Sequence, residues 1–278
     1  MKKIKIVADS SCDLFGLEHT EFETAPMKII TNEKEFVDDP SLDVNGMVDY
    51  LYQYKGKSKS SCPNTTDWID AFGDADEIFC VTITSGLSGS YNSACAAKQI
   101  YESENEGKRV HVFDTLSAGP EITLIIEKIA ECIEHGKVFE DICESVTAYM
   151  RKTGLVFMLK SLKNFANNGR VSPLVAKLVG IAGICIVGKA SDEGTLEPKH
   201  KCRGEHRSLA TLVEDLEAEG FCSGKISIGH CQNESAAEQL KELILAKFKN
   251  VQIDIHKLRG LCSFYAEKGG VLIGFEKA

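Results

Sequence analysis

Short apolar runs alternate with helical patterns in the first half of the chain, and this alternation most constrains the fold. Three runs rich in β-branched or aromatic residues and bounded by turn residues are typical of buried parallel strands: 4–8, 78–83 and 110–113. Three other segments carry apolar residues at helical spacing: 66–72, 90–102 and 121–135. Strands and helices in this order predict an α/β fold with a doubly wound parallel sheet.

The second half mixes strands and helices less regularly, which predicts a separate α+β domain. A length of 278 residues also favours two domains over one core. We place the boundary near residue 155, between an N-terminal α/β domain at 1–155 and a C-terminal α+β domain at 156–278. In the second domain we expect helices at 156–167, 208–219 and 234–248, a glycine-rich apolar stretch at 178–188, a hairpin around 192–194, and strands at 225–230, 251–257 and 271–275.

Composition and charge disfavour several classes of protein. With 43% hydrophobic and 26% charged residues, the composition is that of an ordinary globular protein. The formal net charge of −9 disfavours nucleic acid as a partner, because phosphate binding needs a basic face. No apolar run is long enough to span a membrane, and the basic start has too few apolar residues for a signal peptide. We therefore expect a cytoplasmic protein without a membrane span.

The cysteines and histidines show no spacing typical of a metal site. The 11 cysteines are odd in number, scattered and without a C-x-x-C pair, so we interpret them as reduced. The histidines lack the H-x-x-x-H and H-E-x-x-H patterns. The phosphate loop G-x-x-x-x-G-K-[ST] and a G-x-G-x-x-G after a strand are also missing, so no motif indicates a metal, a nucleotide or another cofactor.

The turn at 84–91 is the strongest candidate for chemistry, because an apolar strand runs directly into hydroxyls and glycines. Glycines let backbone N–H groups approach a ligand, hydroxyls add donors, and the following helix adds its positive end. Such a turn suits a phosphate, a carboxylate or an oxyanion. Gly86-Leu87-Ser88-Gly89-Ser90 nearly spells the G-x-S-x-G nucleophile elbow but fails at its last position, and no histidine stands in a partnered motif. These failures disfavour Ser88 as a nucleophile, and we expect no catalytic residue.

A second hydroxyl cluster, Ser60-Ser61-Cys62-Pro63-Asn64, precedes the helix at 66–72. Its residue types are typical of a turn with a helix cap. A helix start also attracts an anion, so the cap and an anion site are compatible. Polar residues follow the strands at 4–8 and 110–113 as well, and the carboxyl ends of parallel strands meet at one edge of a sheet. The basic run at 199–203 would suit a carboxylate or phosphate if an arginine from it reached this edge.

Taken together, these segments resemble the DegV family, the fatty-acid-binding carrier subunits of bacterial fatty acid kinase. The resemblance covers nearly the whole chain. It rests on six motifs in order: Ile6 to Leu14, Ser60-Ser61-Cys62-Pro63 where the family has Thr-Ser-x-Pro, Thr84 to Tyr91, Val112-Phe113-Asp114-Thr115 with Gly119, Asn168-Gly169-Arg170-Val171-Ser172, and Arg203.

The resemblance implies a DegV-like fold in which two domains enclose an apolar tunnel for a long-chain fatty acid. By the family pattern, the fatty-acid carboxylate is bound by the hydroxyl turns, namely Ser60, Ser61, Ser88 and Gly89, with Arg203 as the charge partner. Arg170 is expected at the mouth, in contact with an acyl phosphate or with the kinase. The protein would then be a carrier rather than an enzyme, and it would present the carboxylate to a separate ATP-dependent fatty acid kinase subunit.

The C-terminal turn departs from the family. Relatives carry His-x-Gly-Pro-Gly, with a histidine that contacts the head group, whereas this chain has Tyr265-Ala266-Glu267-Lys268-Gly269-Gly270. Ala266 or Glu267 is expected near the place of the histidine, and a glutamate there would repel a carboxylate unless Lys268 or Arg203 screened it. Two alternatives stay open: an enzyme acting on a small carboxylated or phosphorylated substrate in the interdomain cleft, and a carrier for another amphiphile.

Overall fold

The computed structural model describes residues 2–171, 175 and 183–278. Its first sheet is parallel throughout, in the order β2-β1-β6-β7. The strands are β1 (Ile4–Asp9), β2 (Glu21–Ala25), β6 (Glu77–Thr82) and β7 (Arg109–Asp114). The predicted parallel strands at 4–8, 78–83 and 110–113 are therefore confirmed, whereas β2 has no counterpart in the sequence prediction.

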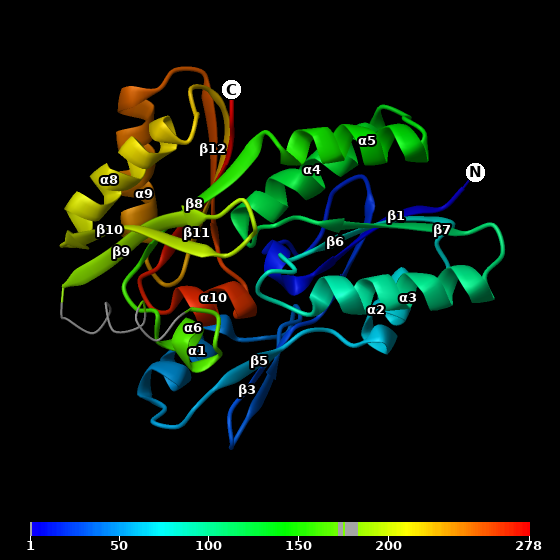
Figure 1. The fold of residues 1–278 in the computed structure, drawn as a ribbon, viewed down its shortest axis with the longest axis horizontal. Helices are drawn as coiled ribbons and strands as arrows, with labels where there is room; N and C mark the ends of the chain where they lie inside the picture. Colours follow the sequence, from blue (N-terminus) through cyan, green and yellow to red (C-terminus); the bar gives the residue numbers. More distant parts are fainter. Residues whose placement is uncertain (1, 172–174, 176–182) are drawn as a thin grey trace.

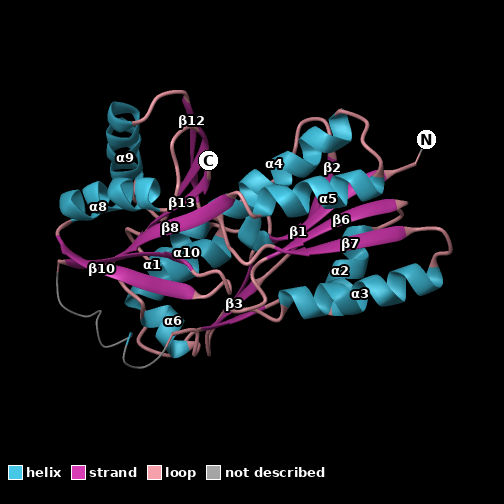
Figure 2. Cartoon of the chain, turned by 45° about the horizontal axis from the view of Figure 1, so that its top comes forward, coloured by secondary structure: helices cyan, strands magenta, loops and turns pink. Residues whose placement is uncertain are grey.

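Helices cover both faces of this sheet (Figure 2). They are α2 (Thr65–Phe72), α3 (Ser90–Glu104), α4 (Pro120–Glu134) and α5 (Phe139–Met150). Because successive strand residues point to opposite faces, Ile6 and Phe79 pack in one core with α4 and α5, while Val7 and Ile78 pack in another with α2 and α3. This is the doubly wound arrangement that the alternating sequence predicts.

The second sheet is mixed, with the order β10-β9-β8-β13-β11-β12. It lies on the left in Figure 1, and the first sheet lies on the right. Its strands are β8 (Thr153–Leu159), β9 (Ile184–Ala190), β10 (Leu196–Arg203), β11 (Gly224–His230), β12 (Val251–Lys257) and β13 (Val271–Glu276). The helices α8 (Glu205–Ala218) and α9 (Glu234–Lys247) pack on one face. The predicted hairpin joins β9 to β10, and the predicted strands and the two long helices of this half are confirmed.

The helix predicted at 156–167 is wrong. Residues 153–159 form the central strand β8, and helix α6 covers only Lys163–Asn167. Val156 and Met158 enter the core under α8 and α9, whereas Leu155 and Phe157 enter the core on the opposite face. A strand buried on both faces is a continuous apolar run, and its periodicity does not distinguish it from a helix. The expected boundary near residue 155 falls inside this strand, and the expected stretch at 178–188 lies partly outside the described residues.

A small antiparallel sheet lies beside both larger ones, with the order β4-β3-β5. It consists of β3 (Lys28–Ile30), β4 (Glu35–Val37) and β5 (Lys59–Ser61), and it is accompanied by α1 (Val44–Gln53) and α10 (Gly260–Ala266). Strands of three residues are too short to show a period, and none of them was predicted. No helix among the described residues is long and apolar enough to cross a membrane.

Candidate functional site

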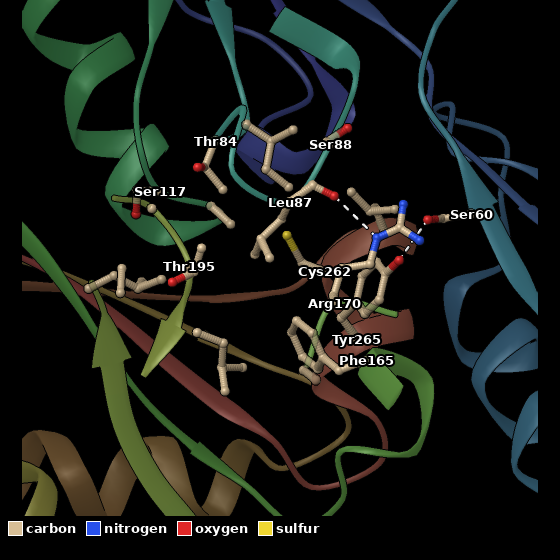
Figure 3. A pocket seen from close by; sticks show the side chains of 18 of the residues that line it. Ser60, Thr84, Leu87, Ser88, Ser117, Phe165, Arg170, Thr195, Cys262 and Tyr265 are labelled. Carbon is tan, nitrogen blue, oxygen red and sulfur yellow. Dashed lines mark hydrogen bonds between the residues drawn. The ribbon is translucent and has the colours of Figure 1, made fainter. Parts of the chain in front are cut away.

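A cavity of about 310 Å³ lies where the carboxyl ends of the parallel strands meet β5, α10 and the inner face of the second sheet (Figure 3). Most of its wall is apolar: Met27, Ile83, Leu87, Leu155, Phe157, Leu159, Phe165, Ala190, Leu196, Leu261, Ala266 and Leu272. One group of polar residues, which includes Ser60, Arg170 and Tyr265, lies where β5 and α10 converge, and Thr84, Ser117 and Thr195 lie on the other side of the cavity. A mostly apolar cavity with a few convergent polar groups is the usual form of a small-molecule site.

Asp9, at the end of β1, holds the turn after β6 in place. Its buried carboxylate accepts hydrogen bonds from the Ile83 N–H at 2.9 Å and the Ser90 hydroxyl at 2.6 Å, and it is also bonded by Ser11. Burial raises the pKa of this carboxyl. The two ends of the turn are therefore tied to the same side chain, which fixes how the intervening residues face the cavity.

The backbone of this turn does not form the open cradle that the sequence predicts. The Leu87 and Ser88 N–H groups donate to the Thr84 carbonyl at 3.3 and 3.2 Å, and the Gly86 N–H donates to the Thr84 hydroxyl at 3.0 Å. The Gly89 N–H has no hydrogen-bond partner among the described residues. Ser88 Oγ accepts the Ser90 N–H at 3.3 Å, which leaves the hydroxyl proton of Ser88 available to a ligand. The site is thus built from side chains and one N–H group.

Ser60 and Ser61, both on β5, also line the cavity. Ser60 is held by its own N–H, which donates to Asn168 Oδ1 at 3.2 Å, and its hydroxyl lies 2.7 Å from the Tyr265 hydroxyl. Ser61 is more exposed, and its hydroxyl donates to the Cys62 carbonyl at 3.3 Å. Ser60 therefore belongs to the inner polar end, and Ser61 lies nearer the solvent.

Arg170 supplies the positive charge of the site. Its Nε donates to the Leu87 carbonyl at 3.2 Å and its Nη1 to the Asn168 carbonyl at 2.6 Å, so the guanidinium is fixed against the turn. Among the described residues, no carboxylate forms an ion pair with Arg170, and its Nη2 has no hydrogen-bond partner. A fixed guanidinium without a counter-ion, at the end of an apolar cavity, is suited to bind an anionic ligand group.

Arg203, which the family resemblance implies as the charge partner of the head group, lies apart from this arrangement. It is exposed at the end of β10 and is absent from the described cavity wall. Leu196, at the opposite end of the same strand, does line the cavity. The two residues are seven positions apart on an extended strand, which separates them by roughly 23 Å at about 3.3 Å per residue.

The C-terminal turn contributes Tyr265 rather than Glu267. Tyr265 and Ala266 line the cavity, whereas Glu267 turns to the other side of α10 and accepts the Asn164 N–H at 3.1 Å. The expected repulsion between Glu267 and a carboxylate is therefore avoided. Sequence reasoning did not assign Tyr265, although it immediately precedes the two positions proposed for the missing histidine.

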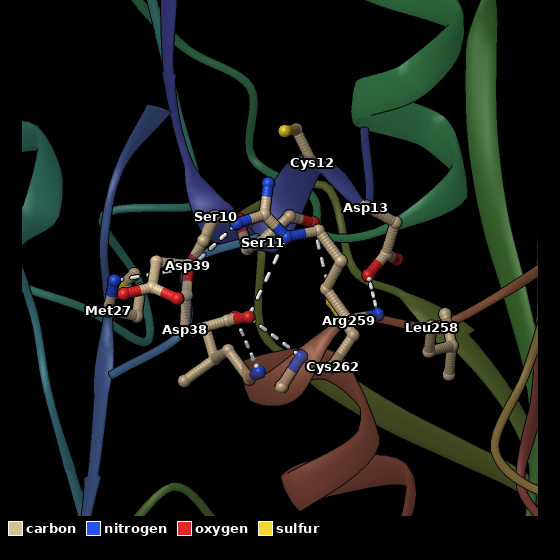
Figure 4. Close-up of polar contacts among 12 residues, drawn as sticks. Ser10, Ser11, Cys12, Asp13, Met27, Asp38, Asp39, Leu258, Arg259 and Cys262 are labelled. Carbon is tan, nitrogen blue, oxygen red and sulfur yellow. Dashed lines mark hydrogen bonds and ion pairs between the residues drawn. The ribbon is translucent and has the colours of Figure 1, made fainter. Parts of the chain in front are cut away.

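A buried cluster around Arg259 fixes α10 and thereby Tyr265 (Figure 4). The Asp38 carboxylate accepts hydrogen bonds from the Gly260 and Leu261 N–H groups at 2.9 and 2.8 Å. Two N–H groups in the first turn of α10, which have no partner within the helix, are thereby hydrogen-bonded. The Arg259 guanidinium donates to the Asp38 carbonyl at 2.8 Å, and the Arg259 N–H donates to Asp13 at 2.7 Å. The start of α10 is thus bound to both the first sheet and the small sheet.

Among the residues that the structure describes, no histidine lines the cavity and no base hydrogen-bonds to Ser88. This part of the chain can therefore bind and orient an anionic head group, and it shows no nucleophile and base pair of the kind that acyl transfer by a serine requires.

Comparison with known proteins gives the family. The model of the family described as "Uncharacterised protein, DegV family" matches residues 3–278. The chain belongs to the DegV family. A DegV domain-containing protein of Streptococcus pneumoniae is 43% identical over 276 residues, which is 98% of both chains.

Two solved structures of the DegV family are similar to this chain throughout. A DegV family protein from Eubacterium eligens loaded with heptadecanoic acid is 43% identical to this chain, with a TM-score of 0.97. The match covers 99% of this chain and 100% of the Eubacterium eligens chain. The Streptococcus pneumoniae fatty acid kinase (Fak) B3 protein loaded with linoleic acid is 43% identical, with a TM-score of 0.96 and 99% of each chain covered. The expected DegV-like α/β fold is thus confirmed.

Proposed function

We propose that this protein binds a long-chain fatty acid in the cavity and presents its carboxylate to a separate, ATP-dependent fatty acid kinase. The observation that carries the proposal is Arg170, a fixed guanidinium with no carboxylate partner among the described residues, in a cavity whose wall is mostly apolar. The fatty acids in the Eubacterium eligens and Streptococcus pneumoniae relatives support this ligand class.

The acyl chain supplies most of the affinity in this proposal, because each buried methylene stabilises the complex by about 0.8 kcal/mol. The polar end then orients the head group: Arg170 binds the carboxylate, and Ser60, Ser88 and the Gly89 N–H donate to its oxygens. Ser61 joins them once its hydroxyl turns from the Cys62 carbonyl to the ligand. In this assignment Arg170 takes the role of charge partner that the family resemblance implies for Arg203. We infer a cytoplasmic carrier of two domains that meet near residue 155, without catalytic activity of its own.

Native mass spectrometry of the protein purified from cells tests the proposal. We expect an added mass equal to that of a long-chain fatty acid, and a raised melting temperature when palmitate is added to delipidated protein. An apo mass together with no thermal shift from palmitate or oleate would refute the fatty-acid assignment. Turnover of a small carboxylated substrate by the isolated chain, abolished by Ser88→Ala, would instead support an enzyme.

A further inference from the structure

The hydroxyls of Ser60 and Tyr265 form a pair at the polar end of the cavity (Figure 3). Their oxygens lie 2.7 Å apart, although the residues are 205 positions apart in sequence. Ser60 comes from β5 and Tyr265 from α10, so the pair connects two elements that meet at the head-group end. Both side chains line the same cavity wall as Arg170.

Two hydroxyls that share one hydrogen bond leave one proton unused. A phenol is a stronger acid than an alcohol, so Tyr265 is the better donor within the pair and Ser60 Oγ the better acceptor. The hydroxyl proton of Ser60 is then free, and no other acceptor among the described residues binds Ser60 Oγ. An anionic oxygen in the cavity would be the natural acceptor, because a charged acceptor strengthens a hydrogen bond.

The position of the phenol is fixed before any ligand binds. The ring of Tyr265 packs against Phe165 and Phe264, with centroids 4.7 and 4.8 Å away. The start of α10 is held by Asp38 and Arg259 (Figure 4). Burial also raises the pKa of Tyr265, so the phenol keeps its proton at neutral pH. A donor held in this way requires little ordering when the ligand arrives.

We propose that Tyr265 completes the head-group site through a hydroxyl relay. The phenol donates to Ser60 Oγ, Ser60 donates to one carboxylate oxygen, and Arg170 supplies the charge. This inference rests on the proposed function and narrows its head groups to anionic acceptors such as the ionised carboxylate of a fatty acid, because the relay and the guanidinium offer only donors. A fatty alcohol or a methyl ester is uncharged, so it would accept weaker hydrogen bonds from the same donors.

Tyr265→Phe tests the relay, because it removes the phenolic oxygen and keeps the ring. We expect palmitate binding to weaken by about three- to tenfold, as for the loss of one neutral hydrogen bond. Binding of methyl palmitate, whose carbonyl oxygen is an uncharged and weaker acceptor, should fall by a smaller factor than binding of palmitate, and its retention shows that the variant is folded. In NMR titrations of palmitate labelled with carbon-13 at its carboxyl, the pKa of the bound carboxyl should be higher in Tyr265→Phe than in the wild type.

Tyr149→Phe is the matched control, since the Tyr149 hydroxyl is also partly buried but donates to Glu276 at 2.9 Å, away from the cavity. It should leave palmitate affinity and the carboxyl titration unchanged. A double-mutant cycle with Ser60→Ala should show strong coupling, because removal of Ser60 already breaks the relay.

Wild-type affinity and an unshifted carboxyl titration in Tyr265→Phe would overturn the relay while leaving the fatty-acid assignment intact. Additive losses in the cycle would also overturn it. Failure of the wild-type protein itself to bind palmitate would overturn the proposed function and the relay together, so the two failures are distinguishable.

Discussion

Replacing Arg170 by glutamine should separate recognition of the carboxylate from recognition of the acyl chain. Arg170 has no carboxylate partner among the described residues, so its charge is available to the ligand, while Nε and Nη1 hold the Leu87 and Asn168 carbonyls. Hydrogen bonds to charged groups contribute about 1.5–3 kcal/mol. At 1.4 kcal/mol for each factor of ten, Arg170→Gln should weaken palmitate binding by roughly 10- to 150-fold.

Isothermal titration calorimetry with two ligands makes this prediction specific. Palmitate carries the charge, whereas hexadecanol has a chain of the same length without it. Loss of the two carbonyl contacts disturbs the turn and α6 for both ligands alike, so the ratio of the two affinities isolates the carboxylate contact. We expect Arg170→Gln to abolish most of the preference for palmitate over hexadecanol.

Arg203→Gln is the matched control, since Arg203 is exposed and lies outside the described cavity wall. It should leave both affinities unchanged. If Arg170→Gln weakened palmitate and hexadecanol by the same factor, the role of Arg170 would be structural. A loss of palmitate preference in Arg203→Gln would show that the sequence assignment was right and the structural one wrong.

Three further perturbations test the site and its frame. Ser88→Ala should weaken palmitate binding by about 1–3 kcal/mol in the same calorimetric assay, because a charged oxygen loses a donor; wild-type affinity in Ser88→Ala combined with a loss in Ser61→Ala would move the contact to Ser61. Burial lowers the pKa of His256 from 6.5 to about 4, so the unfolded chain binds more protons in that range and acidification across it should cost about 3 kcal/mol of stability. Urea unfolding of His256→Asn should show a shallower dependence on pH between these values, and equal slopes would contradict the assignment. Gly194→Ala should lower the melting temperature, because Gly194 has φ +72° and a Cβ there would lie 2.0 Å from Thr84 Oγ1; an unchanged melting temperature would mean that the hairpin relaxes freely.

The parallel sheet could be predicted because its signals are local. The strands β1, β6 and β7 are apolar runs between turn residues, and the polar residues after them mark their carboxyl ends. Chain topology then brings those ends to one edge, which is why the sequence alone places Ser88 near Asp9. The small sheet and α10 could not be predicted in this way, since three-residue strands and a seven-residue helix carry no measurable period.

Which arginine is proposed to bind the carboxylate could be decided only from tertiary geometry, because residue type does not distinguish the candidates. Arg170 and Arg203 are both arginines near turns, and each would suit a carboxylate. What separates them is that Arg170 follows α6, which Asn168 ties to β5, whereas Arg203 lies at the far end of a strand whose other end reaches the cavity. Tyr265 was missed for a similar reason, because its partner Ser60 is 205 positions away.

The closed turn at 84–88 explains why side chains bind the head group in this proposal. An open nest of N–H groups suits a phosphate, which has several oxygens to satisfy at once. A fatty acid presents two oxygens, and the rest of its length contacts the wall with methylenes. Any unpaired N–H group facing those methylenes would cost about 1–3 kcal/mol. By donating to the Thr84 carbonyl and hydroxyl, the N–H groups of Leu87, Ser88 and Gly86 are satisfied within the turn. These backbone donors thus present no unpaired N–H group to the acyl chain, and Arg170, Ser60 and Ser88 remain as donors for the carboxylate.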